Sequence, residues 1–170
     1  MRFYSGFSLR DEAPFFDAFL DRGAYCVAGF SYGAIRATEA VYGASERVDR
    51  LQLFSPAFFQ NRDARFKRMQ MMGFSRDPEG YAARFLTGCF EPYALRPVER
   101  DSATEADLRR LLEYLWKPEM LEAIAAKGTR IEVYLGGEDR IVDAAAAREF
   151  FLPFATVTTI KKANHFLQES

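Results

Sequence analysis

The sequence Tyr25-Cys26-Val27-Ala28-Gly29-Phe30-Ser31-Tyr32-Gly33 says more about this protein than any other segment. Its first four residues are apolar and strand-like, and the alanine-rich residues 34–42 that follow it end at Gly43, as a helix would. A serine between two glycines, in the pattern G-x-S-x-G, therefore occupies a strand-to-helix turn. This turn is so tight that side chains two positions either side of the serine would collide. We expect Ser31 in a strained backbone conformation, with its hydroxyl directed away from the sheet.

Strand and helix signals alternate on both sides of this segment. Upstream, the pattern predicts a strand at residues 2–5 and a helix at about residues 11–22, capped by Asp11 and ended by Gly23. Downstream, it predicts strands at residues 51–54, 130–135 and 156–160, and a helix that follows Asp143 and runs through Phe151. Alternation of this kind indicates a mostly parallel sheet with helices on its faces.

The alternation stops between residues 60 and 128, where several helices are expected in succession. One carries Phe66, Met69 and Met72, a second starts near the capping-box pair Ser102 and Glu105, and a third runs from Pro118 to Lys127. We interpret residues 60–128 as a helical lid inserted into a single α/β domain that spans residues 1–170.

The composition narrows the function classes. With 23 Lys and Arg against 24 Asp and Glu in 170 residues, the net charge of −1 argues against a dedicated nucleic-acid binder. Hydrophobic residues make up 49 % of the chain, which is enough for one packed core. No apolar run approaches the ~20 residues of a membrane helix, and the N-terminus lacks a secretory signal. We therefore expect a soluble, cytoplasmic protein that binds no membrane.

The chain offers little for metal or thiol chemistry. It has one histidine and no closely spaced Cys/His set, so we expect no metal and no other cofactor. Cys26 lies in an apolar run, and no basic group is placed to activate its thiol. This favours a small buried hydrophobic residue over a catalytic cysteine.

A serine hydroxyl attacks a carbonyl well only when a base removes its proton, and the usual base is a histidine oriented by a carboxylate. The single histidine, His165, stands just after the last predicted strand, and Asp139 follows the strand before it. Asp143 competes for the acid role but suits helix capping better, and Glu138 ranks third. Serine, acid, histidine is the chain order of the α/β-hydrolase fold. We therefore expect a compact α/β-hydrolase fold with Ser31, Asp139 and His165 as nucleophile, acid and base; the alternative is a surface histidine and a loop-capping aspartate.

The oxyanion that forms when a serine attacks an acyl carbon needs two donors, usually backbone N–H groups. The residue after the nucleophile, Tyr32, supplies one of them. The loop after the first strand supplies the other, and we assign it to the amide of Phe7. The alternative for the preceding Gly6 is an ordinary turn glycine.

The chain resembles a known family over essentially its whole length. The resemblance rests on residues 3–7 (FYSGF), 29–35 (GFSYGAI), 53–56 (LFSP), 66–70 (FKRMQ), 137–141 (GEDRI) and 164–168 (NHFLQ). Together these segments look like BioV-type pimeloyl-[acyl-carrier protein] methyl ester esterases, compact α/β-hydrolases of biotin synthesis. The resemblance implies hydrolysis of the methyl ester at the far end of a carrier-bound pimeloyl chain. Methanol leaves first, and water then releases the pimeloyl group from Ser31.

An acidic acyl-carrier protein as partner requires basic residues near the entrance of its esterase. Arg62, Arg65, Lys67 and Arg68 are the candidates, with only Asp63 opposing them; the alternative is a solvated helix face. Phe66, Met69, Met72 and Trp116 are candidates to line a channel for the acyl chain, although apolar residues at helical spacing are more often core. The oligomeric state is not predicted.

Two other functions compete with this interpretation. The same triad would serve a general short-chain carboxylesterase or an acyl thioesterase, because lid and pocket shape choose the substrate. A non-catalytic module that binds acyl chains or acyl-carrier protein is the third possibility, and the complete set of triad residue types argues against it.

Overall fold

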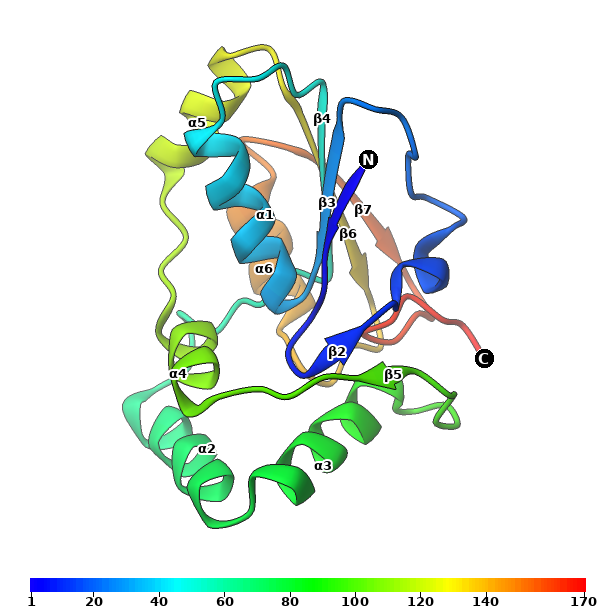
Figure 1. The fold of residues 1–170 in the computed structure, drawn as a ribbon, viewed down its shortest axis with the longest axis vertical. Coiled ribbons are helices and arrows are strands. Elements are labelled where there is room, and N and C mark those ends of the chain that lie inside the picture. The colour runs from blue at the N-terminus through cyan, green and yellow to red at the C-terminus, as the bar shows by residue number, and fades with distance from the viewer.

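The computed structural model describes residues 1–170 and contains one five-stranded sheet in which all neighbouring strands are parallel (Figure 1). In spatial order the strands are β1 (Arg2–Tyr4), β3 (Cys26–Phe30), β4 (Arg50–Phe54), β6 (Arg130–Gly136) and β7 (Thr156–Ile160). Because the strands are parallel, their C-terminal ends lie at one edge of the sheet. The predicted mostly parallel α/β architecture is confirmed.

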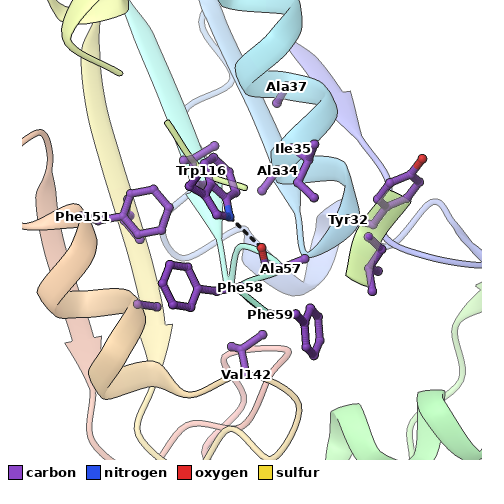
Figure 2. Packing of buried hydrophobic residues seen from close by; sticks show 14 of the residues in the cluster. Tyr32, Ala34, Ile35, Ala37, Ala57, Phe58, Phe59, Trp116, Val142 and Phe151 are labelled. Carbon is purple, nitrogen blue, oxygen red and sulfur yellow. Dashed lines mark hydrogen bonds between the residues drawn. The ribbon is translucent and has the colours of Figure 1, made fainter. Parts of the chain in front are cut away.

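Three helices build the larger of two apolar cores on one face of the sheet. They are α1 (Tyr32–Gly43), α5 (Pro118–Ala126) and α6 (Ala144–Phe151) (Figure 1). Figure 2 shows how a polar atom is satisfied inside this core: the Trp116 indole N–H donates to the Ala57 carbonyl at 2.8 Å. Trp116 also packs edge-on against Phe151, with 5.0 Å between the ring centroids. Trp116, a candidate for the acyl channel, is therefore a core residue.

The helix predicted at residues 11–22 is wrong. A 3₁₀ helix, η1 (Ala13–Phe16), and a turn segment take its place. Asp11 has a left-handed φ of 59° and does not cap a helix. Gln52 on β4 then binds the following segment, because its side-chain amide donates to the Phe19 carbonyl at 2.9 Å and accepts the Asp21 N–H at 2.8 Å. The Asp21 N–H thus pairs with a distant side chain, whereas in a helix it would pair with the Asp17 carbonyl.

The lid lies across the edge of the sheet where the strands end (Figure 1). It contains α2 (Ala64–Arg76), α3 (Pro78–Phe90) and α4 (Glu105–Glu113). A short antiparallel pair, β2 (Leu9–Arg10) with β5 (Glu99–Arg100), joins the lid to the loop after β1. None of the helices is both long enough and apolar enough to span a membrane.

Two details of this region differ from the sequence-based expectation. The capping box of α4 is formed by Thr104 and Asp107, not by Ser102 and Glu105: the Asp107 N–H donates to Thr104 Oγ1, and the Thr104 N–H donates to Asp107 Oδ2. The last helix assigned to the lid, α5, contacts α1 beside the sheet instead of the lid helices. A capping pair shifted by two residues keeps the same physical role, because the first-turn amides still find acceptors.

Candidate active site

Ser31 lies in the turn between β3 and α1 with φ of 52° and ψ of −114°, a conformation that side chains rarely adopt. Two glycines make the turn possible. A Cβ atom on Gly29 would lie 2.3 Å from the Gly33 carbonyl oxygen, and one on Gly33 would lie 1.9 Å from the Tyr4 carbonyl oxygen. Both contacts are with backbone atoms, which cannot rotate away. The chain therefore packs as tightly around the serine as the G-x-S-x-G pattern predicts.

His165 follows β7 and is fully buried, with its Nε2 atom 2.9 Å from Ser31 Oγ. The preceding residue holds the loop in place. Asn164 donates from Nδ2 to the Phe90 carbonyl at 2.8 Å, and its Oδ1 accepts the Gln168 N–H at 3.0 Å. Because both ends of this amide are paired with backbone, the imidazole has little freedom to leave the serine.

Asp139 follows β6, and its Oδ2 atom lies 2.6 Å from His165 Nδ1. Its other oxygen accepts the backbone N–H groups of Ile141 at 2.7 Å and Val142 at 3.1 Å. A carboxylate in this position favours the imidazole tautomer with its proton on Nδ1, which leaves Nε2 free to accept the serine proton. Ser31, His165 and Asp139 thus form one continuous hydrogen-bonded chain.

The two competing carboxylates lie elsewhere. Asp143 caps α6, with Oδ1 accepting the Ala146 N–H at 3.0 Å, and its other oxygen accepts from Asn61 at 3.2 Å. The Glu138 side chain is exposed. Neither side chain hydrogen-bonds to the imidazole, so geometry selects Asp139 among the three.

Two backbone amides are free to stabilise an oxyanion. The Phe7 N–H donates to no acceptor in the structure, although Phe7 is only 2 % exposed. Tyr32 is the first residue of α1, and N–H groups in the first turn have no acceptor within their helix. The Phe7 ring packs against lid residues Phe74, Tyr81 and Phe85, so the loop after β1 and the lid share one apolar cluster.

An apolar cavity of about 310 Å³ lies between the lid helices and the loop after β6, and none of the three triad residues lines it. Ile141, next to the acid, and Phe85, packed on Phe7, are among its walls. The full set of lining residues is Phe59, Phe66, Gln70, Tyr81, Arg84, Phe85, Leu111, Leu112, Arg140 and Ile141. Of the residues considered for an acyl channel, Phe66 lines this cavity and Met69 is 59 % exposed to solvent.

A larger, basic groove of about 660 Å³ lies between α2 and α4 and shares Leu112 with the apolar cavity. Its basic lining residues are Lys67, Arg68, Arg76 and Arg109, and Met72 also lines it. The other two candidate carrier-binding residues lie outside it: Arg62 stacks over the Phe66 ring at 5.1 Å, and Arg65 is exposed. None of Arg62, Arg65, Lys67 and Arg68 forms an ion pair with a carboxylate of the chain.

The structure adds lid contacts that sequence reasoning missed. The Tyr32 hydroxyl donates to Asp107 Oδ1 on α4 at 3.2 Å, and Arg110 on the same helix pairs with Glu39 on α1. Both contacts join residues more than 70 positions apart, and no local pattern marks such partners. They attach α4 directly to the helix that follows the serine.

The two cysteines are free and buried, and neither is a competing nucleophile. Burial raises the pKa of Cys26 to about 11, and burial raises the pKa of Cys89 as well, so both thiols stay protonated at neutral pH. The structure gathers no group of three His, Cys, Asp or Glu side chains able to hold a metal ion.

Comparison with known proteins supports this description of the fold. A family model described as "Alpha/beta hydrolase family" matches residues 4–170. Similar solved structures include a carboxylesterase of the thaumarchaeon Nitrososphaera gargenis (TM-score 0.59, 14 % identity, covering 83 % of this chain and 57 % of that one) and carboxylesterase CesB of Bacillus subtilis (0.58, 18 %, 95 % and 62 %). BioG of Haemophilus influenzae is also similar (0.59, 12 %, 97 % and 87 %). No curated protein sequence matches significantly.

Proposed function

Because the chain belongs to the alpha/beta hydrolase family, we propose that it is a serine carboxylesterase that hydrolyses the methyl ester of pimeloyl-[acyl-carrier protein] methyl ester. One observation supports ester hydrolysis above all others: the buried chain from Ser31 through His165 to Asp139, with distances of 2.9 Å and 2.6 Å. A nucleophile, an orientable base and a carboxylate in this order make up the machinery of acyl transfer. The chain spans only about 57 % and 62 % of the two carboxylesterases named above. The activity of those longer proteins is therefore not assigned to this chain on the basis of structural similarity.

In the proposed reaction Ser31 Oγ attacks the ester carbonyl while His165 Nε2 accepts its proton. The carbonyl oxygen becomes an oxyanion, and the N–H groups of Phe7 and Tyr32 donate to it. When the intermediate collapses, the imidazolium passes its proton to the departing methoxide and methanol leaves. Water, deprotonated by His165, then attacks the acyl-Ser31 ester and releases the free carboxylate. Asp139 keeps the imidazole in the required tautomer throughout.

The substrate assignment draws on the family resemblance together with two surfaces of the lid. The apolar cavity, whose wall includes Ile141 next to the acid and Phe85 next to Phe7, suits an acyl chain. The groove between α2 and α4 is lined by Lys67, Arg68 and Arg76, which suit an acidic carrier protein, and it meets the apolar cavity at Leu112. Its fourth basic residue, Arg109, pairs with Glu105 and Glu113. A carrier docked over the groove would therefore deliver its acyl chain toward Ser31.

The experiment that tests the substrate compares pimeloyl-[acyl-carrier protein] methyl ester with free short-chain esters and with an acyl thioester. We expect free carboxylate and methanol from the carrier-bound ester, with a kcat/KM at least about tenfold above that of the free esters, because docking supplies binding energy that small esters lack. Equal kcat/KM values would favour the general short-chain esterase. Preferential release of thiol would favour the thioesterase.

Reversing two charges on α2 tests the carrier surface. Arg65→Glu combined with Arg68→Glu is expected to lower kcat/KM for the carrier-bound ester about 10- to 100-fold, because the exposed basic side chains attract an acidic partner. Hydrolysis of a free ester should stay within about twofold. The matched control is Arg130→Glu with Arg148→Glu, two exposed and unpaired arginines outside the lid. If the two double variants affect both substrates equally, α2 is an ordinary solvated helix face.

The role of Asp139 as the acid of the triad is tested by replacing it with asparagine. Asp139→Asn is expected to lower kcat about 10³-fold or more, because an asparagine favours the imidazole tautomer that cannot accept the serine proton. Asp143→Ala is the control: it removes the α6 cap, with a cost of about 1 kcal/mol in the free energy of unfolding, and leaves kcat unchanged. Steady-state kinetics and urea denaturation separate the two effects. The opposite pattern, with Asp143 essential and Asp139 dispensable, would transfer the acid role.

A further inference from the structure

Glu12 is a carboxyl group buried where stability alone would favour an apolar side chain. It is 0 % exposed, and it lies at the start of η1, which places Phe16 in the aromatic core. Its Oε1 atom accepts the Gly6 N–H at 2.7 Å, whereas its Oε2 atom has no hydrogen-bond partner. Burial raises the pKa of Glu12, and the Gly6 N–H acts in the opposite direction. A buried, half-satisfied carboxyl lowers the stability of a fold, so a role beyond packing is needed to account for it.

Gly6 immediately precedes Phe7, whose backbone N–H has no acceptor in the structure and is the donor that we assign to the oxyanion. Glycine has more backbone freedom than any other residue, so this loop needs external contacts to hold one conformation. The Gly6 N–H is held by Glu12, and the Gly6 carbonyl accepts the Leu9 N–H at 3.3 Å. Gly6 also lies close to the sheet, because a Cβ atom on it would lie 2.9 Å from the Phe30 ring.

These contacts determine the direction of the next N–H. The Gly6 carbonyl and the Phe7 N–H belong to one planar peptide unit and point in opposite directions. Holding the carbonyl through Leu9 and the preceding N–H through Glu12 fixes the planes on both sides of the Gly6 Cα atom. Without Glu12 the first plane loses its hydrogen bond, and the 3.3 Å contact with Leu9 alone holds the second.

We infer that Glu12 is a positioning residue of the oxyanion loop, residues 5–7: its buried carboxyl holds the Gly6 N–H and thereby directs the Phe7 N–H at the developing oxyanion. Glu12 does not touch the reacting atoms. The inference rests on the proposed ester hydrolysis, because only that reaction forms an oxyanion beside Phe7. It assigns a role to a residue that lies outside the triad and its two amide donors.

Three substitutions test the inference. Glu12→Gln keeps an oxygen within reach of Gly6 and is expected to hold kcat within about threefold. Glu12→Met removes the acceptor, and Glu12→Asp keeps a carboxyl but shortens its reach. Both are expected to lower kcat about 10- to 100-fold with KM within about twofold, since a contact made only in the transition state affects kcat alone. If Glu12→Met fails to fold, the difference in kcat between Glu12→Gln and Glu12→Asp still tests the inference.

A boronic acid that adds to Ser31 gives a second measurement, because its tetrahedral adduct places an oxygen at the oxyanion position. Its inhibition constant should rise in proportion to the fall in kcat/KM. The control is Gln52→Met, which removes an equally buried polar side chain that holds residues 19–21 and not the oxyanion loop. This variant should lose stability and keep kcat. The inference would be overturned if kcat fell equally in Glu12→Met and Gln52→Met. It would also be overturned if kcat fell as far in Glu12→Gln as in Glu12→Met.

Hydrogen exchange of the Gly6 amide separates this inference from the proposed function. The Gly6 N–H should exchange at least about tenfold faster in Glu12→Asp and Glu12→Met than in the wild-type protein or Glu12→Gln. Wild-type protein that cleaves no ester would contradict the proposed function. An unchanged exchange rate of the Gly6 N–H in Glu12→Asp and Glu12→Met would contradict the role of Glu12 in holding the loop, whatever the activity of these variants.

Discussion

Replacement of Ser31 by alanine is expected to abolish ester hydrolysis, with a fall in kcat of about 10⁴-fold or more. The hydroxyl is the only nucleophile within hydrogen-bond distance of His165 Nε2, and both cysteines are protonated at neutral pH. Water activated by His165 would replace it poorly, because no covalent intermediate then divides the reaction into two easier steps. The fold should persist, since alanine removes one atom and introduces no new contact.

A second buried serine provides a matched control for this prediction. Ser55 also lies at the end of a strand with positive φ, at 41°, and its hydroxyl has no hydrogen-bond partner. Ser55→Ala should keep kcat within about threefold. A serine-directed phosphonate, followed by mass spectrometry, should label wild-type protein and Ser55→Ala on Ser31, and should not label Ser31→Ala. Folded wild-type protein without label would favour the non-catalytic binding module.

Replacement of Gly33 by alanine is expected to cost at least about 4 kcal/mol in the free energy of unfolding, a large part of what holds an ordinary domain together. The added Cβ atom would lie 1.9 Å from the Tyr4 carbonyl oxygen and 2.6 Å from that of Ser5. Both are backbone atoms at the end of β1, so relief requires the strand to move away from α1. That movement would also displace the oxyanion loop, so any protein that remains folded should lose activity.

The control for this substitution is another glycine of the same helix. Gly43 is the last residue of α1, and a Cβ atom there would meet nothing within 4 Å. Gly43→Ala should therefore change the free energy of unfolding by no more than about 1 kcal/mol, in the stabilising direction expected from helix propensity. Urea denaturation measures both variants. A Gly33→Ala protein as stable as Gly43→Ala would show that α1 and β1 do not approach each other this closely.

Much of the fold could be predicted because the relevant signals are local. The strands at residues 51–54, 130–135 and 156–160 match β4, β6 and β7 to within a residue, since each is a short apolar or β-branched run bounded by loop residues. The predicted helix cap at Asp143 is confirmed, and its signal is also local. The juxtaposition of Ser31, Asp139 and His165 also follows from local signals, because parallel strands bring their C-terminal ends to one edge.

Contacts between residues far apart in the chain could not be predicted from the sequence. The segment at residues 11–22 has helical spacing, yet Gln52, some 30 positions away, binds its backbone groups and only a short 3₁₀ helix remains. Trp116 lies in the main core, as apolar residues at helical spacing more often do, and its indole N–H donates to the distant Ala57 carbonyl. Nothing in the local sequence marks either partner, since hydrogen bonds across the sheet depend on which segments the topology brings together.

The sequence alone determined the parallel α/β framework, the tight serine turn and the order of the three candidate catalytic groups, because hydrophobic period, glycine spacing and strand ends are properties of neighbouring residues. The three-dimensional arrangement determined where the apolar cavity and the basic groove meet, and that Glu12 is buried against Gly6. Each of these depends on burial and on distances between residues far apart in the chain. From the sequence alone, a charged residue such as Glu12 is expected to be exposed, and only the fold shows which residues bury it.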